Sequence, residues 1–323
     1  MKVQGGWKNA QGEFTNNGFV IIDSTFHNDT ASTTQGNGHY KIQKHWYNNG
    51  LFQKDSSLVT LNGQKQFIAG KEPTHFQNLH IKGTNFKRMK INTYVHDTLD
   101  LNNLELQTGK DTLFALTEDP GAIQHDTISG DEGFISSDLA SKGSFSRNIA
   151  AGEKYILPLG ASTPNRRYRP LVIDARNNDT VHTAFVNTDP SNDGYNRTIK
   201  EDSICKVNEK WYHRIESDSS LDINILYKTQ DGDFHSIVQW DSAWKEKNNA
   251  TKEQINGFRS IKVRNIRDFN SNNFALTRLN PDNFSVWGDS LACKNSVNPA
   301  VFRANTNNLQ WEVKGGEIIS SHN

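Results

Sequence analysis

Two short acidic segments contain the residues whose spacing could support chemistry. Asp231 and Asp233 flank a glycine. Two such carboxylates could act as acid and base at a glycosidic bond, although Asp-Gly-Asp is also typical of a plain turn, which we favour. Residues 189–194 place oxygen side chains at positions 1, 3 and 5 and glycine at position 6, as a calcium loop does. The twelfth position is Lys200 instead of an acidic residue, so we favour a loop without metal. We expect no cofactor, with calcium the one possibility left open.

Other combinations of reactive side chains lack the spacing that catalysis or metal binding requires. His75 and His80 are five residues apart, which places them on opposite faces of an extended segment. The sequence contains no HExxH, GxSxG, P-loop or GxGxxG signature. Cys205 and Cys293 are too few for a disulfide framework or a zinc cluster. We expect them to be two unrelated buried thiols, with their pairing undecided, and we predict that the chain is not an enzyme.

Aromatic side chains are further candidates for binding, because an aromatic ring can stack on the apolar face of a sugar. The tryptophans considered are Trp7, Trp46, Trp240 and Trp244. Tryptophan in β-rich modules more often packs in the core, and we favour that interpretation.

Aspartate followed by Ser or Thr, and then by an apolar residue or Thr, is more frequent than the composition predicts. The hydroxyl residues in this context are Ser24, Thr30, Thr98, Thr112, Thr127, Thr180, Ser203, Ser242 and Ser290. The pattern resembles the O-glycosylation acceptor sequence of Bacteroidota, and glycans there would add bulk at loops. It is equally typical of a turn that leads into a strand. We expect at most a subset to be modified, which a native mass above 36.5 kDa would reveal.

The composition excludes several classes of partner. Lys and Arg total 36 and Asp and Glu total 36, so the formal net charge is 36 − 36 = 0. A protein built to bind nucleic acid or an anionic membrane would carry a basic excess, so we expect neither. The apolar runs are far shorter than the roughly 20 residues that span a bilayer. The 17 Phe, 8 Tyr and 7 Trp argue against disorder, and abundant turn-forming residues favour an all-β chain.

Short strands closed by Asn or Gly recur over residues 1–118, for example at 58–63, 76–83 and 97–106. This rhythm predicts an irregular β-solenoid with coils of roughly 15–25 residues, the alternative being a β-sandwich with long hairpins. Residues 119–142 are expected to form a connector with one short strand.

The rest of the chain continues the all-β pattern. Alternation of apolar and polar residues, as at 221–227 and 260–266, favours a β-sandwich over 143–281. Residues 282–323 are expected to begin an Ig-like β-sandwich that the chain does not finish.

Three segments resemble modules of secreted surface proteins of Bacteroidota. Residues 7–16 (WKNAQGEFTN), 59–63 (VTLNG) and 76–81 (FQNLHI) keep the motif order of a solenoid-like module, with Leu61 where the family has Phe. Residues 144–276 are similar to the β-sandwich module that follows it in such proteins. Residues 311–319 (WEVKGGEII) resemble the first half of a polycystic-kidney-disease-like, Ig-type module.

The resemblance implies a non-enzymatic segment of a large extracellular protein, exported by the type 9 pathway and similar to gliding adhesins. Such a segment would act as an adhesin, a stalk or a filament element. Its partners would be other modules of the same polypeptide or identical subunits, surface glycans, and the secretion machinery in transit. The start of the chain is not apolar, so we expect a mature or excised piece. The alternative is an accessory or catalytic part of a glycan-active secreted protein.

Overall fold

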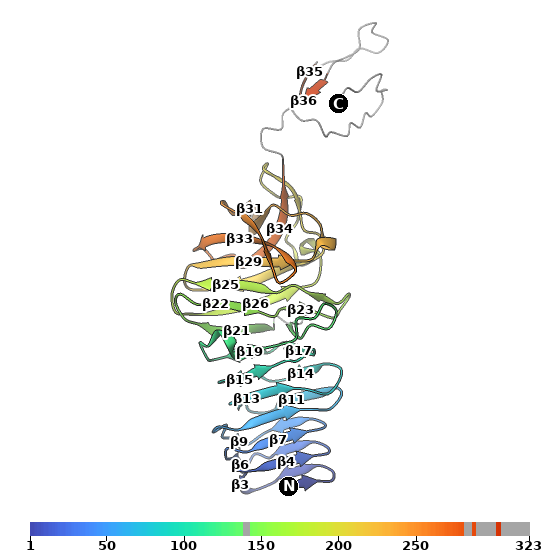
Figure 1. Ribbon diagram of the computed structural model, residues 1–323, viewed down its shortest axis with the longest axis vertical. Coiled ribbons are helices and arrows are strands. Elements are labelled where there is room, and N and C mark those ends of the chain that lie inside the picture. The colour runs from blue at the N-terminus through green and yellow to red at the C-terminus, as the bar shows by residue number, and fades with distance from the viewer. Residues whose placement is uncertain (138–142, 281–285, 289–301, 305–323) are drawn as a thin grey trace. The chain divides into compact units, whose positions relative to one another are not determined.

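The computed structural model describes residues 1–137, 143–280, 286–288 and 302–304 (Figure 1). It is nearly all β, and the regular helix among these residues is limited to short 3-10 turns, which confirms the predicted fold class. None of the described helices is long and apolar enough to cross a membrane. The chain divides into two units, Met1–Arg278 and Leu279–Asn323. In the second unit the structure describes an antiparallel pair, β35 (Val286–Gly288) and β36 (Phe302–Ala304), so the predicted Ig-like module lies largely outside the described residues.

The first unit begins with a β-solenoid of about six turns, whose coils stack through parallel strand pairs (Figure 1). Each coil contributes one strand to each of three faces. Face 1 contains β1 (Lys2–Val3), β4 (Phe19–Ile22), β7 (His39–Ile42), β10 (Leu58–Leu61), β13 (Asn78–Ile81), β16 (Leu99–Asp100) and β19 (Ile123–Gln124). Face 2 contains β2 (Trp7–Asn9), β5 (Phe26–Asn28), β8 (Trp46–Asn48), β11 (Gln66–Gly70), β14 (Lys87–Met89), β17 (Glu105–Gln107) and β20 (Phe134–Ser136).

Face 3 is built in two parts. One sheet contains β3 (Gly12–Thr15), β6 (Ser32–Gln35) and β9 (Leu51–Phe52), and a second begins with β12 (Thr74–Phe76), β15 (Thr93–Val95) and β18 (Thr112–Ala115). On face 1, Phe19 lies beside His39, 20 residues on, whereas Leu99 lies beside Ile123, 24 residues on. The coil length therefore varies within the range that the sequence predicted.

Stacked identical positions hold the solenoid together from inside. The rings of Phe26 and Trp46 are buried and stack at 4.1 Å between centroids, and Ile68 and Met89 continue the row on the next coils. Burying such a side chain contributes about 1.5–3 kcal/mol. Trp46 is therefore a core residue, as favoured above.

A buried asparagine row closes one corner of the first coils. Asn28 donates from Nδ2 to Asn48 Oδ1 at 2.9 Å, and its Oδ1 accepts from Ser32 Oγ and Thr34 Oγ1, each at 2.9 Å. The row ends at Gly70, where a Cβ would lie 1.8 Å from the Asn48 carbonyl oxygen. The asparagine side chains thus replace the backbone partners that the corner lacks.

Replacing Asn28 with alanine should lower the free energy of unfolding by about 2 kcal/mol, because Asn48, Ser32 and Thr34 lose a buried partner. Urea titration of the whole chain measures this change. Asn17→Ala, at an exposed corner, is the control and should change it by less than about 0.5 kcal/mol. Equal effects of the two substitutions would refute a structural role for the row.

A β-sandwich follows, and it shares a strand with the solenoid. β21 (Ser144–Ile149) pairs in parallel with β18 and antiparallel with β26 (Asp179–Val186). The same sheet continues through β28 (Tyr212–Glu216), β34 (Asn273–Leu279), β30 (Ser236–Asp241) and β31 (Ala243–Glu246), with β27 (Ile204–Val207) beside β34. The facing sheet contains β22 (Lys154–Leu157), β25 (Leu171–Ala175), β29 (Leu221–Tyr227), β33 (Phe258–Ile266) and β32 (Thr251–Ile255).

The segment between the two modules also belongs to the sheets. Residues 119–142, expected as a connector, contain β19 and β20, which extend faces 1 and 2 by one coil. One cluster of buried apolar side chains extends from Val20 in the solenoid to Leu276 in the sandwich. The two modules consequently form one compact unit with a continuous core.

Candidate functional site

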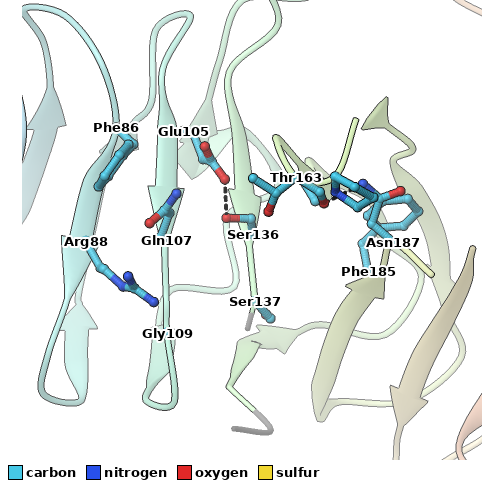
Figure 2. A pocket seen from close by; sticks show the side chains of 12 residues that line it. Phe86, Arg88, Glu105, Gln107, Gly109, Ser136, Ser137, Thr163, Phe185 and Asn187 are labelled. Atoms are coloured by element: carbon cyan, nitrogen blue, oxygen red, sulfur yellow. Dashed lines mark hydrogen bonds between the residues drawn. The ribbon is translucent and has the colours of Figure 1, made fainter. Parts of the chain in front are cut away.

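A pocket of about 410 Å³ opens where the outer surface of face 2 meets the sandwich (Figure 2). Its volume lies within the roughly 300–1,000 Å³ typical of small-molecule sites. The lining residues are Phe86, Arg88, Glu105, Gln107, Gly109, Ser136, Ser137, Ala161, Thr163, Pro164, Phe185 and Asn187.

Strand alternation aims the polar wall of this pocket outward. Glu105 and Gln107 flank Leu106 on β17, and because Leu106 is buried in the core, its neighbours face the pocket. On the adjacent strand β20, Ser136 lies beside Gln107 in the register. Glu105 is only 8% exposed and accepts a hydrogen bond from Ser136 Oγ at 2.5 Å (Figure 2).

The opposite wall is held rigidly by the sandwich. It is built around β23 (Gly160–Ala161) and β24 (Arg167–Tyr168). The buried Asn187 side chain donates from Nδ2 to the carbonyl oxygens of Thr163 and Asn165, both at 2.7 Å, and accepts from Arg167. The pocket is therefore formed without any movement of this loop.

The aspartate pair singled out in the sequence is separated by its environment. Asp231 ends the 3-10 turn η4 (Thr229–Asp231), and its carboxylate lies 2.6 Å from both Nε and Nη2 of the buried Arg169. Asp233 is exposed beside Lys252 and Arg259. The favoured interpretation as a turn agrees with this geometry, and neither carboxylate lines the pocket.

The proposed calcium loop is a turn closed by its own side chains. Asp189 caps η3 (Pro190–Asp193) and contacts Arg197 Nε and Nη2 at 2.8 Å each, while Asp193 accepts from the Tyr212 hydroxyl at 2.9 Å. Both carboxylates that would hold the ion are thus engaged. Within the described part of the chain, no group of three or more His, Cys, Asp or Glu side chains is placed to hold a metal.

The histidines 75 and 80 belong to different faces of the solenoid. On β12, His75 stacks on Tyr94 at 4.3 Å, and its Nδ1 lies 3.0 Å from His96 Nε2. Burial lowers the pKa of both His75 and His96, which favours neutral rings that share one hydrogen bond. His80 lies on β13, with its Nδ1 4.0 Å from Asp100. The two residues therefore form no common site.

The remaining aromatic and thiol candidates also resolve. Trp46 and Trp244 are fully buried, whereas Trp7 packs on Phe14 at 4.5 Å and Trp240 on Trp244 at 5.5 Å, both half-buried. Cys205 is exposed on β27, so the expectation of a buried thiol is wrong there, because its position on this strand faces solvent. Cys293 lies outside the described residues.

The Asp-Ser/Thr positions lie at the surface or just below it. Thr30, Thr127, Thr180, Ser203 and Ser242 are exposed, Ser24, Thr98 and Thr112 are half-buried, and Ser290 lies outside the described residues. The Thr112 hydroxyl lies 3.0 Å from Ser144 Oγ, and the Thr180 hydroxyl donates to Asn148 at 2.9 Å. Their glycosylation stays a prediction, alongside the structural role of the pattern.

Comparison of this chain with protein-family models, with curated proteins and with solved structures finds no match. The pocket itself was not predicted. Alternation in Glu105-Leu106-Gln107 is a signal for the polar wall, but the facing residues near 163 and 187 come from distant parts of the chain.

Proposed function

We propose that this chain is a non-enzymatic segment of a large extracellular surface protein, in which it acts as a stalk or an adhesin. The observation that supports this role best is the shared strand β21, which pairs with the solenoid on one edge and with the sandwich on the other. Successive coils share backbone hydrogen bonds, so a load spreads along the solenoid. At β21 the same ladder passes the load into the next module without a flexible linker.

Side chains reinforce this junction. Arg147 on β21 donates to the Asp119 carbonyl oxygen at 2.5 Å, and the Tyr155 hydroxyl on β22 donates to that of Glu118 at 2.7 Å. The guanidinium of Arg147 also lies 4.9 Å from the Tyr155 ring centroid. Burial lowers the pKa of Arg147 to about 10, which leaves it charged at neutral pH. The sandwich is therefore anchored to the last coils by buried polar contacts.

The cellular setting of the proposal comes from the sequence resemblance. It comprises surface location, type 9 export and partners that are other modules or identical subunits. Zero net charge favours such packing, because self-repulsion between identical chains is small. Probing intact cells with an antibody and an impermeant protease, followed by imaging of the native protein, tests the proposal. We expect surface exposure and extended particles, and a compact intracellular monomer would contradict it.

A shared core and a shared strand also predict joint unfolding of residues 1–278. Hydrogen exchange measured across a urea series should show amides of β15 and β29 losing protection at the same denaturant concentration. Two separate transitions would mean that the junction does not couple the modules.

Binding of glycans is a second candidate function, and the junction pocket supports it. Its described lining contains one carboxylate, Glu105, and not the pair that hydrolysis of a glycosidic bond requires. Recognition without cleavage is accordingly the version of the glycan-active alternative that this pocket favours.

A further inference from the structure

We infer that the junction pocket binds a neutral sugar residue of a glycan, with Glu105 and Gln107 as the principal contacts. This inference rests on the proposed adhesive function for its biological setting, and it names the ligand class. The binding itself depends only on the pocket and can be tested on the purified chain.

The first argument is the buried carboxylate. Glu105 is about nine-tenths buried, yet among the described residues its carboxylate accepts one hydrogen bond, from Ser136. A carboxylate has about four acceptor positions, and burial without partners is unfavourable. Sugar hydroxyls are neutral donors that would occupy the remaining positions.

The second argument is the arrangement of the other groups. Gln107 follows Glu105 on the same face of β17, about 7 Å along the strand, and offers an amide donor and acceptor. The Ser136 and Ser137 hydroxyls lie beyond it on β20 (Figure 2). The half-buried ring of Phe86 stands on the solenoid side and provides an apolar surface for the C–H face of a sugar. Polar groups on one side and a ring on the other match the two faces of a sugar.

The third argument concerns charge. Arg88 and Glu105 are the charged residues of the described lining, so their charges sum to zero. A different groove on the sandwich, of about 720 Å³, is lined by Lys247, Arg264 and Arg267 with Asp268, and this is where an acidic sugar would be attracted. The junction pocket therefore favours a neutral ligand.

The test uses the whole chain, an array of neutral and acidic oligosaccharides, and calorimetric titration with the neutral oligosaccharide that binds best. Glu105→Gln and Gln107→Ala should each weaken binding about tenfold or more, because hydrogen bonds to a charged or buried group are lost. Glu105→Gln keeps an acceptor for Ser136, so its denaturant midpoint should stay unchanged. The matched control is the double variant Arg264→Gln/Arg267→Gln, which alters the other groove and should bind the neutral ligand as the wild type does.

Three results would overturn the inference. They are an array without any neutral ligand, unchanged affinity of both pocket variants, and binding of acidic sugars alone that is lost in the Arg264→Gln/Arg267→Gln variant. A cytoplasmic location of the native protein would contradict the surface function and leave the measured sugar affinity intact, so the two failures are distinguishable.

Discussion

Replacing Asp231 with alanine should lower the free energy of unfolding by about 3–5 kcal/mol. The carboxylate contacts Arg169 through two guanidinium nitrogens at 2.6 Å, and the two side chains are 5% and 3% exposed. It also accepts the Lys228 backbone N–H at 2.9 Å. Without it, a buried guanidinium keeps its charge and loses its counterion, which is why the cost exceeds that of an ordinary hydrogen bond.

Asp233→Ala is the matched control, two residues away. Asp233 is 58% exposed and its ion pairs with Lys252 and Arg259 are open to solvent, so its loss should cost less than about 1 kcal/mol. Urea titrations of the two variants and the wild type measure the difference. Similar values for both aspartates would show that the Arg169 pair is not a buried structural contact.

Acidification from pH 6.5 to pH 4 should destabilise the protein by up to about 3 kcal/mol through His213 alone. Burial lowers the pKa of this fully buried histidine to about 4, against 6.5 for an ordinary histidine. Between these two values the unfolded chain binds a proton that the folded chain does not, so the free energy of unfolding falls as the pH falls. A difference of 2.5 pKa units corresponds to about 3 kcal/mol.

His213→Gln removes the titrating ring, and its amide N–H can replace the bond from Nε2 to the Arg169 carbonyl oxygen, which spans 3.0 Å. Unfolding measured at intervals from pH 7.5 to pH 4 should give a flatter profile for this variant than for the wild type. His235→Gln, at a position 38% exposed, should reproduce the wild-type profile. If His213→Gln retains the full wild-type slope, another group is responsible for the acid sensitivity.

The solenoid could be predicted because its signal is local. Asn and Gly at the corners, and apolar residues such as Leu79 and Leu99 at equivalent places in successive coils, recur at short spacing. Each coil buries the same positions against the next, so the repeat is visible in the sequence. The length of the last coils was harder to predict, because the longer step from Leu99 to Ile123 breaks the rhythm, and residues 119–142 resembled a connector.

The candidate site could be predicted only in part. The outward direction of Glu105 and Gln107 follows from strand alternation around a buried leucine. That Thr163 and Asn187 stand opposite depends on how the sandwich folds back over face 2. The aspartate pair was singled out because its members are close in sequence, and burial then assigned them different environments.

The sequence by itself determined the all-β class, the stacking of coils and the neutral surface, since these depend on residue type, short-range spacing and total charge. Only the tertiary structure decided that β21 joins two modules, that Arg169 meets Asp231 across 62 residues of chain, and that the pocket exists. These features arise from contacts between segments far apart in the chain, and their partners are selected by packing and by the burial of charge, neither of which leaves a periodic pattern in the sequence.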